Sequence, residues 1–395
     1  MSTVGGEPFA SGFECTNSPS CCLAGRRDAK EAFKTRKLVL PSANFIKTYF
    51  SSYSNDPINT AIIPSDSVDP KGFVRAKQAL DSGRYEEVIA ACTEEMDAGE
   101  SAKYKLEATL LRGTFHLLCG SPAESLVDLN SIIENPANAV AFRVNAFIKR
   151  ASLNVQSEQH LKGFEDFEEA EKLDASNADL YHQRGQVYTL LEKFDAALAD
   201  LTKCCILNPD HCSAYVQKCY VEYRAAAASQ NRFEVYRALD AVAESVVKFP
   251  NSIECYNVYS QILTEQQQFA EADELFDKAM ALAPTQASLY VHRGLLYLQW
   301  NGDINKALES LNKAIEIDDK CELAYETLGT IQVQRGLLEN AIDLFEKALK
   351  LTRSELEMTH LYSLRNAAIA QMNVAKKLGL DLSSLSALSQ MPTMP

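Results

Sequence analysis

The sequence predicts an all-α fold: an α-solenoid, in which antiparallel helix pairs stack into a superhelix, closed by a C-terminal capping helix. Three observations lead to this fold class. A small residue recurs at nearly constant spacing, a second small residue recurs with matching steps, and prolines stand between the units. Internal self-similarity is typical of repeat architectures, so it decides the fold class before any single motif does.

One stretch shows the repeating unit most completely. Residues 178–210 read ADLYHQRGQVYTLLEKFDAALADLTKCCILNPD. The aromatic, small, aromatic, small, bulky apolar and proline positions of the tetratricopeptide pattern are filled, in that order, by Tyr181, Gly185, Tyr188, Ala197, Leu201 and Pro209. The spacing predicts two antiparallel helices that cross where the side chains are small.

The two small positions can be followed along the chain. The first recurs in steps of 38, 34, 34, 41, 34 and 35 residues, at Gly113, Ala151, Gly185, Cys219, Ser260, Gly294 and Gly329. The second recurs in steps of 41, 34, 35 and 34 residues, at Ala197, Ala238, Ala272, Ala307 and Ala341. Prolines that end helices follow at Pro136, Pro209, Pro250 and Pro284. Both series contain the step of 41, which predicts a lengthened loop at AAAASQNR (225–232).

These series divide the chain into four parts. We expect a disordered tail over residues 1–26, which are rich in Gly, Ser and Pro, and a linking helix and loop over 27–68. A tetratricopeptide array of about eight helix pairs, the first of them weak, is expected over 69–379 and ends in a capping helix that stops at Gly379. Residues 380–395 are expected to form a frayed tail.

Composition excludes several function classes. The net charge of −14, from 39 basic and 53 acidic residues, argues against a general nucleic-acid binder, which needs a basic surface. The negative charge suits basic or amphipathic partners instead. No apolar run approaches the ~20 residues of a membrane-spanning helix. No secretory signal opens the chain, so we expect its 11 cysteines in a reducing compartment.

The first helix of each pair lines the concave face of such an array, with its second, fifth, ninth and twelfth residues pointing inward. These positions mix apolar, aromatic and acidic side chains, which suits an amphipathic helix or an extended apolar segment as ligand. The alternative is that single members pack on a neighbouring turn. The residues predicted to line this peptide-binding groove are His182, Gln186, Val216, Tyr220, Tyr223, Asn257, Gln261, Val291, Leu295, Leu298, Glu326, Thr330 and Val333.

A carboxylate clamp for an acidic peptide tail is a sharper alternative, and it needs Lys or Arg and Asn at inward positions of successive units. The fifth and ninth positions instead hold Ile148 and Ser152, His182 and Gln186, Val216 and Tyr220, and Asn257 and Gln261. No basic cluster forms, so we do not expect a clamp in these repeats.

Neither catalysis, a cofactor nor a metal site is predicted. The six histidines are dispersed and lie in no recognisable nucleophile or metal motif. The densest cluster, KCCILNPDHCSAYVQKC (203–219), spreads over two predicted helices and a turn, whereas zinc needs about four converging ligands. We interpret Cys204 and Cys219 as small fillers at helix crossings, a common role of free cysteine.

Several stretches are more specific than the repeat pattern. They read LPSANFIKTYFSSY (40–53), NADLYHQRGQVYTLLEKFDAALADL (177–201), LTEQQQFAEADELFDKAMALAP (263–284), YVHRGLLYLQW (290–300), KAIEIDDKCELAYETLGTIQVQRG (313–336) and SELEMTHLYSL (354–364). In this order they resemble the 70-kilodalton receptor subunit of the mitochondrial outer-membrane protein translocase. The resemblance implies an import receptor, or its precursor-binding domain, that recognises internal targeting signals of precursors such as hydrophobic carriers. A soluble tetratricopeptide co-chaperone or assembly scaffold is the alternative.

The resemblance covers the family's linking segment and second tetratricopeptide domain. Family members also carry a membrane anchor and a first domain that clamps chaperone tails, and residues 1–26 match neither. The implied partners are precursor proteins, targeting peptides, other translocase subunits and full-length receptor. The implied location is the cytosolic face of the mitochondrial outer membrane, or the cytosol for a genuine short product. A shortened gene product and an incomplete gene model both stay open.

Overall fold

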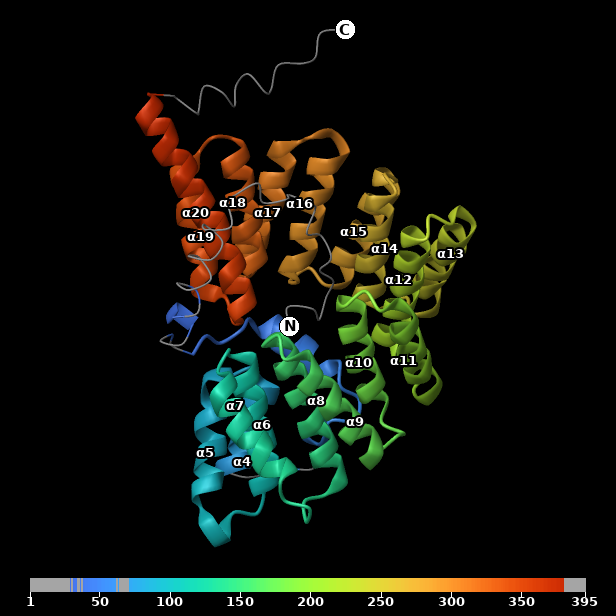
Figure 1. The fold of residues 1–395 in the computed structure, drawn as a ribbon, viewed down its shortest axis with the longest axis vertical. Helices are drawn as coiled ribbons and strands as arrows, with labels where there is room; N and C mark the ends of the chain where they lie inside the picture. The colour runs from blue at the N-terminus through green and yellow to red at the C-terminus, as the bar shows by residue number, and fades with distance from the viewer. Residues whose placement is uncertain are drawn as a thin grey trace. The chain divides into compact units, whose positions relative to one another are not determined.

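The computed structural model describes residues 29, 31–33, 36, 38–61, 63 and 71–379 (Figure 1). Within those residues all regular structure is helical, which confirms the all-α prediction. The described residues divide into two compact units: those between 40 and 258 form one, and those between 29 and 39 and between 259 and 379 form the other. The tails predicted over 1–26 and 380–395 lie outside the described residues.

The first unit is built from consecutive helix pairs. From α4 onward, α4 packs with α5, α6 with α7, α8 with α9, α10 with α11 and α12 with α13, and neighbouring pairs pack on one another. Their bounds are α2 Ala43–Ser51, α3 Pro57–Thr60, α4 Gly72–Ser82, α5 Val88–Asp97, α6 Lys105–Leu118, α7 Pro122–Ile133, α8 Val140–Gln156, α9 His160–Leu173, α10 Ala178–Leu190, α11 Phe194–Leu207, α12 Cys212–Ala228 and α13 Arg232–Lys248. The weak first repeat of the prediction corresponds to α4 and α5.

The second unit repeats the same motif. Here α16 packs with α17 and α18 with α19, and the long α20 packs on α19. The bounds are α15 Phe269–Leu282, α16 Ala287–Asn301, α17 Ile304–Ile317, α18 Glu322–Gln334, α19 Leu338–Leu351 and α20 Glu355–Leu378. Ser354 and Glu357 form a capping box at the start of α20, and Gly379 ends it at φ 62°, as predicted. One further helix, α14 (Ile253–Glu265), contains the boundary between the units at 258/259.

The recurring small residues are buried where paired helices cross. A Cβ added to Gly185 would lie 2.9 Å from Leu201 Cγ, and one added to Gly329 would lie 2.6 Å from Phe345 Cε1. Contacts this short are closer than carbon atoms tolerate, so each glycine is what permits its helix pair to approach. In both cases the bulky partner comes from the second helix of the same repeat.

The lengthened loop predicted at the step of 41 is wrong. Helix α12 continues through Ala228 and α13 begins at Arg232, so the connection is only three residues, Ser229–Asn231. The extra residues lengthen both helices to 17 residues, against 13 and 14 in α10 and α11. The run of four alanines extends α12 because alanine has the highest intrinsic helix propensity.

An arginine–aspartate ion pair, which the sequence analysis does not predict, recurs in the first unit. Arg112 and Asp128, Arg150 and Asp166, and Arg184 and Asp200 each join the first helix of a repeat to its second. Each arginine directly precedes the small residue of the first helix, so the pairs repeat with its 38- and 34-residue steps. These cations are bound to carboxylates inside their own repeats, and they are not available to clamp an acidic peptide.

Candidate peptide-binding face

A segment from the N-terminal side of the array lies against the first helices of three repeats. This docked segment, Ala43–Thr60, comprises α2, a turn and α3. Helix α3 packs on α6 and α8, and the turn is hydrogen bonded to α10. The docked segment therefore covers inward residues of α6, α8 and α10 that the sequence alone would leave for a ligand.

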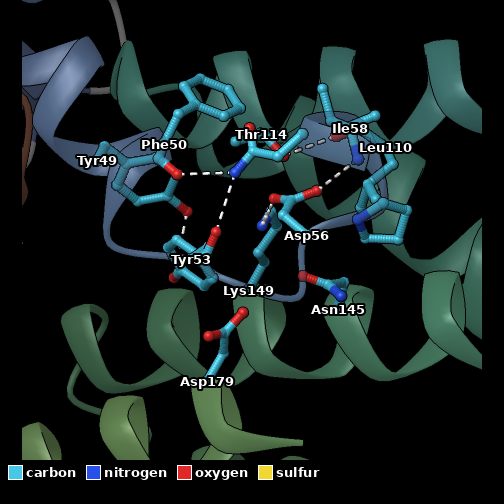
Figure 2. Close-up of polar contacts among 12 residues, drawn as sticks. Tyr49, Phe50, Tyr53, Asp56, Ile58, Leu110, Thr114, Asn145, Lys149 and Asp179 are labelled. Atoms are coloured by element: carbon cyan, nitrogen blue, oxygen red, sulfur yellow. Dashed lines mark hydrogen bonds and ion pairs between the residues drawn. The ribbon is translucent and has the colours of Figure 1, made fainter. Parts of the chain in front are cut away.

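The turn of the docked segment is held by side chains from equivalent positions, 34 residues apart, of two successive repeats. The Asp179 carboxylate accepts hydrogen bonds from the Ser54 amide and hydroxyl at 2.9 and 2.8 Å, and from the Asn55 amide at 2.7 Å. From the preceding repeat, Asn145 Nδ2 donates to the Asn55 carbonyl at 3.1 Å. Figure 2 shows both side chains directed from their helices toward the turn. At these inward positions the Asp179 carboxylate and the Asn145 amide therefore bind the docked segment of the same chain.

A buried ion pair joins the turn of the docked segment to α8. Lys149 Nζ is 2.8 Å from Asp56 Oδ2, and both side chains are fully buried. The second carboxylate oxygen of Asp56 accepts from the Ile58 amide at 2.9 Å and so caps α3. Burial lowers the pKa of Lys149, but the groups around it, with the Asp56 carboxylate contributing most, together raise the pKa of the ammonium group. The Tyr53 ring also faces Lys149, with Nζ 4.2 Å from its centroid (Figure 2).

Apolar packing completes the attachment of the docked segment. Phe50 and Ile58 are buried, and the Phe50 ring lies 6.1 Å from that of Phe115 on α6. Asn59 Nδ2 donates to the carbonyls of Phe50 and Tyr53, so α3 is fastened to the end of α2. The docked segment is thus part of the core of the first unit.

Next to the docked segment, α10, α12 and the start of α14 share a polar cluster. Ser213 Oγ donates to Glu254 Oε1 at 3.0 Å and lies 3.3 Å from His182 Nε2, and the His182 and His211 rings pack edge to face at 4.5 Å. Burial, with His211 adding to it, lowers the pKa of His182 to about 3, so this imidazole is neutral. Burial raises the pKa of Glu254. The cluster is composed largely of neutral hydrogen-bonding groups.

The predicted groove residues differ in their access to solvent. Half-buried side chains, which a ligand could reach, belong to Tyr220, Leu295, Leu298, Glu326, Thr330 and Val333. Buried side chains belong to His182, Gln186, Val216, Tyr223, Asn257, Gln261 and Val291. Helices α10 and α12 lie in the first unit and α16 and α18 in the second, so the predicted lining is divided between the two units. Contact of any of these residues with a ligand stays a prediction.

The cysteine-rich stretch occupies the junction of two repeats. Cys204 and Cys219 are buried on α11 and α12, while Cys212 is the first residue of α12. Among the described residues, no three His, Cys, Asp or Glu side chains are grouped so that they could hold a metal ion. Nor does the described part of the chain contain a helix long and apolar enough to cross a bilayer.

Comparison with known proteins supports the predicted tetratricopeptide repeats. A family model described as tetratricopeptide repeat matches residues 178–211, 253–286, 287–321 and 323–355. A solved structure of yeast Tom70 superposes with a TM-score of 0.66 at 21% identity, covering 96% of this chain and 79% of that chain. The structural similarity supports the tetratricopeptide solenoid fold.

Sequence comparison identifies nearer relatives. The chain is 44% identical over 372 residues to the mitochondrial import receptor subunit TOM70 of Homo sapiens, and equally so to that of Rattus norvegicus. These alignments cover 91% of this chain and 61% of each relative. The same subunit of Saccharomyces cerevisiae is 27% identical over 332 residues, covering 80% of this chain and 51% of the relative. The predicted resemblance is confirmed, and the chain spans about three fifths of the length of its mammalian relatives.

Proposed function

We propose that this chain, a homologue of the mitochondrial import receptor subunits TOM70, binds targeting segments of mitochondrial precursor proteins for delivery to the outer-membrane translocase. The observation that carries the proposal is the 44% identity to the human receptor subunit along 91% of this chain. The proposed ligands are internal signals of hydrophobic precursors, such as carriers, and amphipathic presequence-like peptides. The proposal assigns no catalytic step, in keeping with relatives that are named as receptor subunits.

The accessible inward side chains support an apolar ligand in each unit. In the first unit Tyr220 is half-buried on α12, and in the second unit Leu295 and Leu298 are half-buried on α16. Aromatic and aliphatic side chains at helical spacing suit the apolar face of an amphipathic segment. The net charge of −14 favours encounter with basic peptides.

The proposed location is the cytosolic face of the mitochondrial outer membrane, in keeping with relatives that are named as mitochondrial import receptor subunits. The proposed partners are precursor proteins and other translocase subunits. The docked segment reduces the surface on which these partners can bind, because it already covers inward residues of α6, α8 and α10. We place the ligand-binding surface of the first unit at α12.

A binding experiment tests the proposal directly. The purified chain, with its helicity checked by circular dichroism, is incubated with a labelled carrier precursor, a presequence-like amphipathic peptide and a scrambled peptide of equal charge. We expect saturable binding of the first two ligands and none of the third. A folded chain that binds neither would contradict the receptor function and favour the alternative, a tetratricopeptide co-chaperone or scaffold.

A further inference from the structure

Helix α13 exposes apolar side chains on the side that faces away from its repeat. Its inner side, which includes Ala238 and Val242, is buried where α13 packs on α12. At about 100° of rotation per residue, the opposite side carries Phe233, Tyr236 and Val247, which are 73%, 69% and 79% exposed. Of the aromatic side chains in the described part of the chain, Phe233 and Tyr236 are the most exposed. The first unit therefore leaves an apolar surface of α13 uncovered.

These side chains belong to a stripe with the spacing of a coiled coil. The stripe advances in steps of 3, 4, 3 and 4 residues through Phe233, Tyr236, Asp240, Ala243 and Val247. This alternation keeps the five side chains along one side of the helix, where a second helix can pack lengthwise. Four of the five are exposed and Ala243 is half-buried. We call these five residues the outer stripe.

Other second helices of the repeats carry polar residues at the equivalent positions. Counted from the recurring small residue, the equivalents of the last four outer-stripe residues are Asn305, Glu309, Asn312 and Glu316 in α17, and Glu339, Asp343, Glu346 and Lys350 in α19. All eight of these side chains are exposed. The repeat fold therefore does not require the apolar residues of the outer stripe, and an exposed apolar patch of this kind marks an interaction surface.

Two opposite charges flank the outer stripe along one edge. Arg237 and Glu244 follow Tyr236 and Ala243 by one residue, lie seven residues apart and are exposed. Arg237 is 2.6 Å from Glu234, but its side chain is 71% exposed, and ion pairs at such positions contribute little. In a coiled coil, charges at this edge set the partner and the orientation of the helices.

A second copy of α13 complements the outer stripe when the two helices lie antiparallel. If Tyr236 is level with Val247 of the second copy, then Arg237 is two residues, or about 3 Å along the axis, from the level of Glu244 of that copy. The same two contacts recur in the opposite direction. A parallel pair would instead place each Arg237 level with the other Arg237. The stripe and its flanking charges therefore match themselves in antiparallel order.

We propose that the outer stripe is a self-association surface, on which a second copy of this chain packs its own outer stripe in an antiparallel, two-fold arrangement. A two-fold contact uses the same patch on both copies, so Tyr236 against Val247 and Arg237 against Glu244 each occur twice. This surface goes beyond peptide binding, because the predicted groove is lined by the first helices of the repeats, whereas α13 is a second helix.

The expected dimer is weak. Stable interfaces typically bury about 1,200–2,000 Å², and a single pair of 17-residue helices lies at or below the low end of that range. The net charge of −14 on each copy opposes association further. Asp240 adds a cost, because in the antiparallel pair it lies beside Ala243 of the second copy and loses water. We expect a Kd on the order of 0.1 mM, so the dimer forms where the local concentration is high.

Exchanging the flanking charges tests the arrangement in sedimentation experiments on the full chain. Arg237→Glu and Glu244→Arg should each raise the Kd about tenfold, because like charges then meet at both ends of the contact. An equimolar mixture of these two variants, one of them fluorescently labelled, should associate as tightly as the unmodified chain, since each supplies the charge that the other lacks. Glu309→Arg, the matched control on the exposed side of α17, should leave the Kd unchanged.

Two variants of the stripe itself complete the test. Tyr236→Asp should abolish self-association, whereas Asp240→Asn should lower the Kd severalfold because it removes a charge from the contact. Circular dichroism checks that every variant is folded. A folded chain that stays monomeric at about 0.5 mM would overturn the assignment. So would a mixture that associates no better than its two components, or a Kd that Tyr236→Asp leaves unchanged.

Discussion

Asp56 and Lys149 form an ion pair with 2.8 Å between Oδ2 and Nζ and with neither side chain exposed. Asp56 comes from the turn of the docked segment and Lys149 from the middle of α8, 93 residues further along the chain. Removing two charges from water is costly, so such a pair persists only when its remaining hydrogen-bonding capacity is satisfied. Asp56 meets this condition by capping α3 with its other oxygen.

Lys149→Met should strongly destabilise the first unit. The substitution leaves the Asp56 carboxylate buried without its cation, for which the expected loss is about 3–5 kcal/mol in the free energy of unfolding. Chemical denaturation followed by circular dichroism measures this loss.

The double variant Lys149→Met/Asp56→Asn should recover part of the loss, because it removes the stranded charge and retains an oxygen that can cap α3. Lys77→Met serves as the control: its partner Asp81 is 57% exposed, so the cost should stay below about 1 kcal/mol. If Lys149→Met lowered the free energy of unfolding as little as Lys77→Met does, the buried ion pair would not be needed for the stability of the first unit.

Gly329→Ala should destabilise the second unit more than Gly294→Ala. The added Cβ would lie 2.6 Å from Phe345 Cε1 in the first case, but 3.2 Å from Leu311 Cγ in the second. We expect Gly329→Ala to cost about 1–3 kcal/mol through overpacking. Gly294→Ala should cost less because its contact is longer, so that the helix propensity of alanine, worth up to about 1 kcal/mol at either position, offsets more of the overpacking. Thermal melts compare the two, and relief of Gly329→Ala by Phe345→Leu would identify the clash as the cause.

His292 should contribute to loss of stability in acid. Burial lowers its pKa from 6.5 to about 4. Below pH 6.5, His292 therefore becomes protonated in the unfolded chain while it stays neutral in the folded chain. Stability is fully present above pH 6.5 and falls by about 2–3 kcal/mol as the pH drops toward 4. His292→Gln should reduce the fall of the unfolding free energy over this window, to which the buried His182 also contributes, when denaturation is repeated across pH. An unchanged slope would show that His292 is protonated equally in both states.

Tyr220→Asp should weaken peptide binding without lowering helicity. Tyr220 is half-buried on α12, so a carboxylate there places a charge against the ligand's apolar face, while the fully buried residues of α12 are unchanged. Leu295→Asp makes the same test in the second unit. Phe233→Asp is the matched control, because Phe233 on α13 is 73% exposed and lies outside the predicted groove. Equal affinity in all three variants and the unmodified chain would reject the groove as drawn.

Helix content, repeat register and helix ends follow from the sequence because they are set by residues close together in the chain. Gly379 ends α20, and α11, α13 and α15 each end two residues before a proline, at Leu207, Lys248 and Leu282. The wrong loop at 225–232 also has a local origin: the step of 41 predicts extra residues there, and the four alanines among them favour helix over loop. Repeat spacing locates extra residues but does not say whether they are helical.

The tetratricopeptide solenoid, its repeats and the relationship to the receptor family can be derived from the sequence. Which inward residues are already occupied, and which distant side chains meet, is set by the tertiary structure. Asp56 and Lys149, 93 residues apart, are brought together by the docked segment, and Ser213 and Glu254 are brought together by the stacking of successive repeats. The physical reason is that periodicity reports which face of a helix is inward, whereas contact depends on what the rest of the chain places on that face.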